Sequence, residues 1–366
     1  MRIGILTFHT AKNIGAQLQA FALYVTLKSF NHDVQFIRYE PSYLAKPYRF
    51  FRNVQLKNGI LSCIKQILLH ILFDTKTWLR TINHYNEFQK KYLPISSREV
   101  RSSRDLSELE YDAFIVGSDQ IWNPEITGGK IDDIYSLNFK NNNIKKISYA
   151  ASFSEKHISD QQLKSLIKRL NSFDAISVRE DVLKTFLQPY LKADIHVVLD
   201  PTLLLKKEQW LQYIPKKRII KEKYVLIYQA RGNKKEIVEQ SKKLAEKYEA
   251  VLYDASGMNY RIMKNGIQYA NPIEFLNLIY YAEAIVTVSF HGTALSIILE
   301  KPFYSIILGD GRDGRVENLL KSINLTSQMK ICGEALEKPN IDFKEVANLL
   351  DEYRHTSKEY IVNSLL

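Results

Sequence analysis

One stretch of the sequence places a histidine where a predicted strand passes into a predicted helix. The apolar run Ala284 to Val288 is typical of a buried strand, and Ser289 to Gly292 connects it to a helix expected over residues 293–299. A helix start presents unpaired backbone N–H groups and the positive end of its dipole, which together attract anions. Because an imidazole titrates near neutral pH, His291 could transfer a proton there or donate a hydrogen bond to an anion. A histidine held by local turn hydrogen bonds is the alternative. The neighbours of His291 that we expect to contact the ligand are Ser289, Gly292 and Thr293.

Two loops in the first half of the chain are also rich in hydrogen-bonding groups. The first follows a predicted strand at residues 3–6, and its Asn13, Gly15 and Gln17 lead into a helix that could bind an anion, without a dinucleotide fingerprint. The second follows a predicted strand at residues 113–116, and its candidate substrate contacts are Ser118, Asp119, Gln120, Trp122 and Asn123. We expect Asp119 to be the base for a sugar hydroxyl, with Gln120 and Trp122 shaping a sugar site. An aspartate that caps its own turn explains the pattern equally well.

Three further candidates lie at or after predicted strand ends. Tyr149 ends the strand predicted at residues 146–149, and small residues follow it. Arg179 follows the next strand, where its guanidinium could bind a carboxylate or phosphate through two hydrogen bonds, or could instead pair with Glu180 or Asp181. Arg315 ends a glycine-rich segment at residues 309–315 that is suited to closing over an anion. Together these residues predict a site for a small, multiply charged anion.

The elements that must position these loops alternate between strand and helix along the chain, which predicts parallel sheets with crossover helices. We expect an N-terminal domain over residues 1–200 on the acceptor side and a C-terminal domain over residues 201–340 on the donor side. Residues 341–366 are predicted to form a helix that packs back on the first domain. Pro201 and the polar residues 215–223 form the candidate hinge.

Composition narrows the class of protein. The 366 residues are 45% hydrophobic, and no apolar run is long enough to cross a bilayer. The N-terminus reads as a core strand, which favours a cytoplasmic location. Metal-binding spacings are absent, and with only Cys63 and Cys332 we predict neither a metal site nor a disulfide framework.

The formal net charge of +11 is concentrated in residues 46–92, where nine basic residues stand against two acidic ones. We predict a basic helical insertion there that could lie peripherally on an anionic membrane, whereas a solvated helix packed on the protein is the alternative. No nucleic-acid motif accompanies the charge, so nucleic acid is not expected as a partner.

The sequence resembles the polysaccharide pyruvyl transferase family from Met1 to about Leu325. The segments that carry the resemblance are, in order, Ile3 to His9 with Asn13, Gly15, Ala16, Gln19 and Ala20; Val116 to Pro124; Tyr149 to Phe153; Ser177 to Asp181; Asp200 to Thr202; and Ser289 to Gly292.

The resemblance implies an α/β protein with two Rossmann-like domains facing a cleft, as in GT-B glycosyltransferases. It also implies phosphoenolpyruvate as donor substrate, no cofactor, and a sugar hydroxyl pair as acceptor. The product would be a pyruvate ketal on a bacterial surface glycan such as a capsule or exopolysaccharide. Many members have Arg-Leu-His where this chain has Ser289, Phe290 and His291, and others have aspartate at the place of Val288. Without that arginine, donor binding must depend more on Arg179 and Arg315, or the donor is a molecule other than phosphoenolpyruvate.

Two other functions fit the same fold. One is a GT-B glycosyltransferase with a nucleotide-sugar donor, although no acidic residue is clearly placed for a ribose near His291. The other is a catalytically silent glycan-binding or regulatory relative. A lipid-linked or nucleotide-linked sugar is the expected acceptor, and the basic insertion would hold the enzyme at the inner face of the cytoplasmic membrane. The acceptor sugar, the ketal stereochemistry and the oligomeric state stay open.

Overall fold

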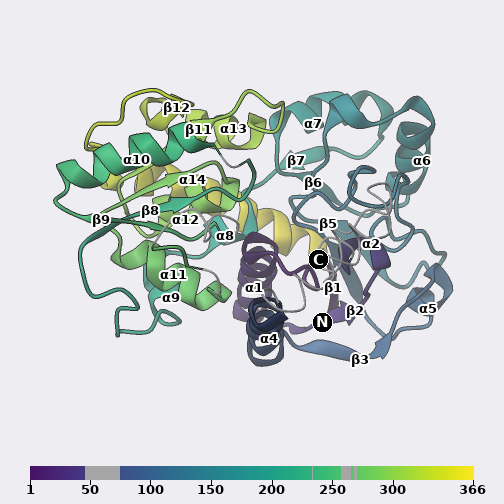
Figure 1. The fold of residues 1–366 in the computed structure, drawn as a ribbon. Coiled ribbons are helices and arrows are strands. Elements are labelled where there is room, and N and C mark those ends of the chain that lie inside the picture. The colour runs from purple at the N-terminus through teal and green to yellow at the C-terminus, as the bar shows by residue number, and fades with distance from the viewer. Residues whose placement is uncertain (46–74, 233, 257–264, 268–269) are drawn as a thin grey trace, which may run out of the picture. The chain divides into compact units, whose positions relative to one another are not determined.

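The computed structural model of the chain describes residues 1–45, 75–232, 234–256, 265–267 and 270–366. It divides into two compact units (Figure 1). Unit 1 contains residues 1–197 together with 363–366, and unit 2 contains residues 198–362. Of the predicted basic insertion, residues 46–74 lie outside the described part, and the remainder forms the helix α4 (Thr75–Tyr92).

Unit 1 is built on a parallel five-stranded sheet in the order β3-β2-β1-β4-β5. The strands are β1 (Arg2–Leu6), β2 (Asp33–Arg38), β3 (Ile95–Glu99), β4 (Ala113–Val116) and β5 (Lys145–Ser148). The central β1 pairs Ile3 with Val34 on one side and with Ala113 on the other. Because β1 and β4 are buried on both faces, their sequences are almost wholly apolar.

A second, two-stranded parallel sheet of β6 (Ile176–Val178) and β7 (Ile195–Val197) follows in unit 1. A bridge between Ile147 and Ala175 places β6 beside β5. The helices of this unit are α1 (Ile14–Ser29), α2 (Ser42–Ala45), α4 (Thr75–Tyr92), α5 (Ser103–Ser107), α6 (Asp160–Leu170) and α7 (Asp181–Leu187), with short 3-10 turns at Glu155–His157 and Gln188–Tyr190.

Unit 2 is built on another parallel five-stranded sheet, in the order β12-β11-β10-β8-β9. Its strands are β8 (Tyr224–Tyr228), β9 (Val251–Asp254), β10 (Ala284–Thr287), β11 (Phe303–Ile307) and β12 (Met329–Ile331). Its helices are α8 (Pro201–Leu204), α9 (Lys207–Leu211), α10 (Lys235–Lys247), α11 (Pro272–Tyr281), α12 (Phe290–Ile298), α13 (Gly314–Ser322) and α14 (Phe343–Leu365), with a 3-10 turn at Thr326–Gln328. The last residues of α14, from Asn363, belong to unit 1.

Helix α12 begins earlier than its sequence predicts. The helix was expected at residues 293–299, but it starts at Phe290 because Ser289 caps it, its hydroxyl accepting a hydrogen bond from the backbone N–H of Gly292 at 3.4 Å. His291 therefore lies inside the first turn of the helix instead of in the loop before it.

Candidate functional site

In unit 1, the loops after β1, β4, β5 and β6 meet at the carboxyl edge of the sheet and are joined by hydrogen bonds. The Thr7 hydroxyl donates to the Ser118 carbonyl at 3.1 Å, and the Ser118 hydroxyl donates to the Ala150 carbonyl at 3.0 Å. The Ser152 hydroxyl in turn donates to Glu180 Oε1 at 3.0 Å. The structure thus brings together, within unit 1, the predicted loops around Ser118, Tyr149 and Arg179. This is the edge at which open α/β sheets bind ligands.

The turn after β4 needs special backbone conformations. Gly117 has φ 110°, and a Cβ there would lie 2.2 Å from the Tyr149 carbonyl oxygen, so only glycine fits. Asp119 has φ 75° and is partly exposed, and its Oδ1 accepts a hydrogen bond from the Gln120 N–H at 2.9 Å. Part of the Asp119 side chain therefore caps its own turn, which is the structural alternative that the sequence left open.

Three residues predicted to contact substrate are instead packed into unit 1. The Trp122 indole has no exposed surface and donates from Nε1 to the Tyr135 carbonyl at 3.1 Å, so its ring is a core element and not an open sugar platform. Tyr149 is also buried. Asn123 is 3% exposed, and its amide donates to Gln120 Oε1 at 3.1 Å while its oxygen caps the Glu125 N–H at 3.0 Å. A single sequence could not distinguish an aromatic in a polar turn from a ligand platform.

The loop after β1 is hydrogen-bonded and buried at residues 7–9 and Ala11, whereas Asn13 at its end is exposed. Asn13 caps α1 by accepting from the Ala16 N–H at 3.0 Å, and Gly15 lies buried in the first turn. Gln17 has no exposed surface, and its amide donates to the Ala11 carbonyl at 3.1 Å. Helix α4 covers part of this loop, because the Gln89 amide donates to the His9 carbonyl at 2.8 Å.

Arg179 is held by its sequence neighbour. Its side chain is 4% exposed, and Nε donates to Glu180 Oε1 at 3.0 Å. This is the pairing that the sequence left open as the alternative to an anion contact. The Arg179 guanidinium lies at the end of β6 with its charge balanced at one edge by a carboxylate.

In unit 2, the turn between β10 and α12 is tightly built around the predicted histidine. Thr287 Oγ1 donates to the Tyr228 carbonyl at 2.8 Å and accepts from the Ser289 N–H at 3.0 Å. A Cβ on Gly292 would lie 2.4 Å from that same hydroxyl, so glycine lets α12 approach the strand closely. Thr293 is fully buried, and its hydroxyl contacts the Ser305 hydroxyl at 2.6 Å. The predicted residues Ser289, His291, Gly292 and Thr293 therefore form one first turn.

His291 faces a buried carboxylate. Its Nε2 lies 3.8 Å from Oδ2 of Asp200, whose side chain has no exposed surface, while the His291 side chain is 11% exposed. Asp200 Oδ1 accepts from the Thr202 N–H at 3.0 Å and from the Thr202 hydroxyl at 2.7 Å, which leaves Oδ2 directed at the imidazole. At 3.8 Å the contact is longer than a hydrogen bond, so Asp200 acts on the imidazole through its negative charge.

Sequence reasoning assigned no role to Asp200, although it lies in one of the segments that carry the family resemblance. Its position before Pro201, typical of a helix cap, was the available signal. The 91-residue separation from His291 hid the pair, since only the fold brings α8 against α12.

The glycine-rich segment at residues 309–315 is held by ion pairs and hydrogen bonds. Arg231, which follows β8 and was not singled out from sequence, forms ion pairs with Asp310 and Asp313, and its Nε donates to the Val288 carbonyl at 3.4 Å. Asp313 also accepts from the Gly309 N–H at 2.8 Å. Arg231 thus brings a guanidinium to the turn that precedes His291, while Arg315 lies in the first turn of α13 and is partly buried.

Neither a metal-binding cluster nor a membrane-spanning helix occurs in the described ranges. No three His, Cys, Asp or Glu side chains there gather closely enough to bind a metal ion. Among the helices that can be described, none has the length and apolar character needed to span a membrane.

Two parallel five-stranded α/β sheets with crossover helices define a GT-B-like fold, and two solved structures share it. UDP-GlcNAc 2-epimerase from Methanocaldococcus jannaschii matches with a TM-score of 0.53 and 14% identity over 96% of this chain and 92% of that chain. A putative UDP-N-acetylglucosamine 2-epimerase from Listeria monocytogenes matches with a TM-score of 0.50 and 11% identity over 98% and 90% of the two chains. An E. coli heptosyltransferase solved with ADP matches with a TM-score of 0.42 and 11% identity over 96% and 100%.

The family model for polysaccharide pyruvyl transferase matches residues 13–309, so the chain belongs to that family. No curated protein matches the sequence. The matched range includes both the Ser118 turn of unit 1 and the Asp200–His291 pair of unit 2.

Proposed function

We propose that this protein transfers the enolpyruvyl group of phosphoenolpyruvate to two hydroxyls of a sugar, forming a pyruvate ketal during surface-polysaccharide synthesis. The observation that carries the proposal is the family match over residues 13–309, which includes His291. The geometry of unit 2 supports it, since the imidazole stands in the first turn of a helix, beside a buried carboxylate.

The proposed chemistry is balanced without a cofactor. One sugar hydroxyl oxygen bonds to C2 of phosphoenolpyruvate while the C3 methylene gains a proton and becomes a methyl group. The C2–O bond to phosphate then breaks, and the second hydroxyl oxygen bonds to C2. Inorganic phosphate leaves, one hydroxyl proton ends on C3, and the other goes to phosphate or solvent.

Within unit 2, His291 is suited to hydrogen-bond the donor phosphate or to carry a proton to C3. Asp200 would hold the imidazole in orientation and favour its protonated form. The N–H groups at the start of α12 would add a positive field for the leaving phosphate. Arg231 and Arg315 are the basic groups that we assign to donor binding in this unit, and Arg179 is the corresponding candidate in unit 1.

We assign the acceptor sugar to the carboxyl edge of the unit 1 sheet. Asp119 and Gln120 are the partly exposed polar residues of that edge, and Asp119 is the candidate base for a hydroxyl. Ser118, Trp122, Asn123 and Tyr149 would act there by fixing the shape of the loops. Asn13, Gly15 and Gln17 would do the same for the loop after β1.

The test is incubation with phosphoenolpyruvate and candidate sugar acceptors, followed by phosphate release and product mass. Wild-type protein should release phosphate and yield a product heavier by one pyruvate ketal, and His291→Ala should abolish both while keeping the wild-type melting temperature. Full activity in His291→Ala would remove the residue from the mechanism. Thermal stabilisation by nucleotide sugars, with no response to phosphoenolpyruvate, would instead support a glycosyltransferase. A catalytically silent relative would bind glycan and release no phosphate.

We further propose that the acceptor is lipid-linked and that the protein meets it at the inner face of the cytoplasmic membrane. The support is the net positive charge of residues 46–92, of which α4 is the described part.

A further inference from the structure

The short helix that begins at Asp200 is held in place by α14, far along the chain. Arg354 Nε donates to the Leu203 carbonyl at 2.7 Å, and one turn further along α14 the Ser357 hydroxyl accepts from the Leu199 N–H at 3.0 Å. Arg354 is 7% exposed and Ser357 has no exposed surface. Helix α14 therefore holds the chain on both sides of Asp200.

The held carbonyl belongs to the same turn as the carboxylate that faces His291. Helix α8 spans four residues, and the Asp200 carbonyl accepts from the Leu203 N–H at 2.9 Å. A single turn has too few internal hydrogen bonds to be stable by itself, so outside contacts determine where it lies. A shift of the Leu203 carbonyl would move the Asp200 carboxylate with it.

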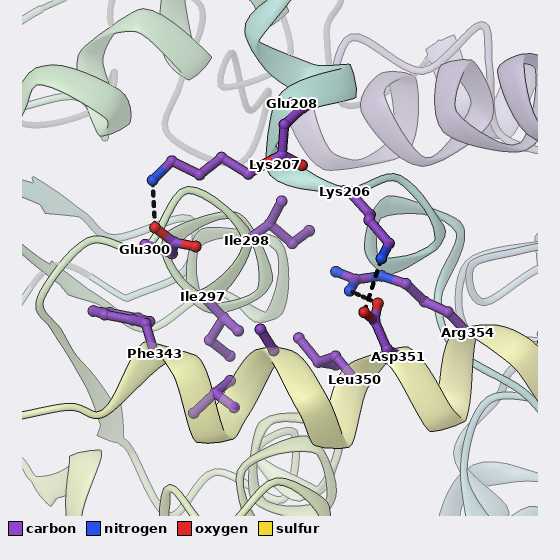
Figure 2. A pocket seen from close by; sticks show the side chains of 12 residues that line it. Lys206, Lys207, Glu208, Ile297, Ile298, Glu300, Phe343, Leu350, Asp351 and Arg354 are labelled. Carbon is purple, nitrogen blue, oxygen red and sulfur yellow. Dashed lines mark hydrogen bonds and ion pairs between the residues drawn. The ribbon is translucent and has the colours of Figure 1, made fainter.

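Figure 2 shows the Arg354 side chain on α14 together with its charged neighbours. Its guanidinium stands beside Asp351 and Lys206 at one side of a cavity of about 180 Å³ between α9, α12 and α14. Arg354 Nη1 lies 2.8 Å from Asp351 Oδ1, and Lys206 Nζ lies 2.8 Å from Asp351 Oδ2. Because the Lys206 side chain is 52% exposed and that of Asp351 is 45% exposed, the Lys206–Asp351 pair contributes little to stability. The buried bond from Nε to Leu203 is the contact that matters for α8.

We propose that Arg354 is a positioning residue for the reaction: through the Leu203 carbonyl it keeps Asp200 at its distance from His291. The inference rests on the proposed function of the Asp200–His291 pair. Arg354 lies beyond residues 13–309, which the family model matches. The chain thus uses a helix outside the family-matched range to fix a carboxylate inside it.

Two substitutions separate this role from charge or packing. In Arg354→Gln the amide nitrogen is as many bonds from Cα as Nε is, so it can still donate to Leu203 although the charge is gone. In Arg354→Met a methyl group occupies the position of Nε and cannot donate a hydrogen bond to Leu203. We expect Arg354→Met to lower kcat about tenfold, the effect of one buried hydrogen bond, with KM for phosphoenolpyruvate little changed. Arg354→Gln should keep at least half of the wild-type kcat. Lys206→Met, which removes only an exposed ion pair, should match wild type.

The double variant Arg354→Met/Asp200→Asn tests whether Arg354 acts through Asp200. Its activity distinguishes this coupling from a purely structural role of Arg354. If Arg354 acts through Asp200, Arg354→Met should cost little further activity once Asp200→Asn is present, whereas independent effects would multiply. Losses that multiply, or a tenfold loss in Arg354→Gln, would overturn the proposal. Where Arg354→Met gives no folded protein, a tenfold loss in Arg354→Gln still overturns the proposal.

Histidine NMR tests the inference without activity. The imidazole signal of His291, assigned by its disappearance in His291→Ala, should shift in Arg354→Met toward its place in Asp200→Asn and stay unmoved in Arg354→Gln. An unmoved signal in Arg354→Met contradicts the inference. Wild-type protein that releases no phosphate from phosphoenolpyruvate would count against the proposed function alone, because the NMR comparison would still report on Asp200.

Discussion

His9, at the end of β1, is a titratable side chain with no exposed surface. Its pKa is lowered to about 4, chiefly by burial; the hydrogen bond from Nδ1 to the Thr7 carbonyl at 3.0 Å offsets part of this effect, and the nearby Lys12 charge adds a smaller lowering. The ring is therefore neutral at physiological pH, with its proton on Nδ1, and packs 5.1 Å from the Phe36 ring. His9 cannot attract an anion through charge, unlike a histidine beside a carboxylate.

A neutral buried histidine makes the protein sensitive to mild acid. Between its ordinary value of 6.5 and the folded pKa of about 4, the unfolded chain binds a proton at His9 that the folded chain does not. Stability is thus lost as pH falls through this window, by about 2 kcal/mol between pH 7 and pH 5. We expect His9→Gln to show a smaller fall in melting temperature between these pH values than wild type. An equal fall in the two proteins would contradict the assigned protonation state.

A substitution at Asp119 distinguishes a catalytic role of its carboxylate from a structural role in the turn. Asn accepts positive φ as readily as Asp does, so Asp119→Asn should keep the turn that needs φ 75°. If the carboxylate is the base for the acceptor hydroxyl, we expect turnover to fall at least a hundredfold with an unchanged melting temperature. Turnover that persists while the melting temperature drops would assign Asp119 to the turn alone.

At the residue scale, the sequence pointed to His291 as a candidate but not to the carboxylate that faces it. The histidine stands out because an apolar strand precedes it and a helix follows, whereas Asp200 became visible only when the fold brought two distant segments together. Trp122 shows the opposite effect: its polar neighbours suggested an exposed ring, yet the turn folds so that the indole lies in the core. Local pattern does not determine which side of a turn faces solvent.

The position of helix α12 is constrained by its close packing against the unit 2 sheet. Gly292 lies over Thr287, whose hydroxyl is fixed by bonds to Tyr228 and Ser289 and cannot move aside. The first turn of α12, and with it His291, is thereby placed against the end of β10. Any side chain at Gly292 must push this turn outward.

We therefore expect Gly292→Ala to destabilise the protein by about 1–3 kcal/mol, the usual cost of overpacking, and to reduce phosphate release. The matched control is Gly314→Ala at the start of α13, where an added Cβ meets nothing within 4 Å. That change should stabilise by up to about 1 kcal/mol, because alanine restricts the unfolded chain. Thermal melts of the two variants check the opposite signs, and a neutral Gly292→Ala would show that α12 can move freely.

Sequence patterns predicted most of the elements that position the site. The strand at residues 113–116 was predicted with the bounds that the structure shows, because it is a short apolar run. Strands β3 and β12 were not predicted. Both lie at sheet edges and contain no fully buried residue, so their sequences lack the apolar signal that a central strand carries. Helix α8 was also missed, since one turn leaves no periodicity.

At the scale of the whole molecule, the charge of +11 raises the question of where the protein works. The described part of the basic segment, α4, is packed on unit 1 through Gln89 and through Asn86, whose side-chain oxygen accepts from Lys12 Nζ at 2.6 Å. One side of this helix is thus engaged with the protein. Lys76 and Arg80 are exposed and lie one turn apart on it. A helix anchored in this way can present cations to a surface without inserting into it.

If those cations meet an anionic membrane, flotation with vesicles containing phosphatidylserine should retain the protein at low salt and release it as salt rises, because screening shortens the range of the attraction. Replacing both Lys76 and Arg80 with Gln should weaken retention at least tenfold, since each basic group near such a surface contributes about 1 kcal/mol. The control replaces Lys242 and Lys243 with Gln on the exposed side of α10, which changes the net charge equally in unit 2. Equal weakening in the two double variants would mean that only net charge matters. Absence of wild-type retention, even at low salt, would leave the charge without a membrane role and would favour a soluble, nucleotide-linked acceptor over a lipid-linked one.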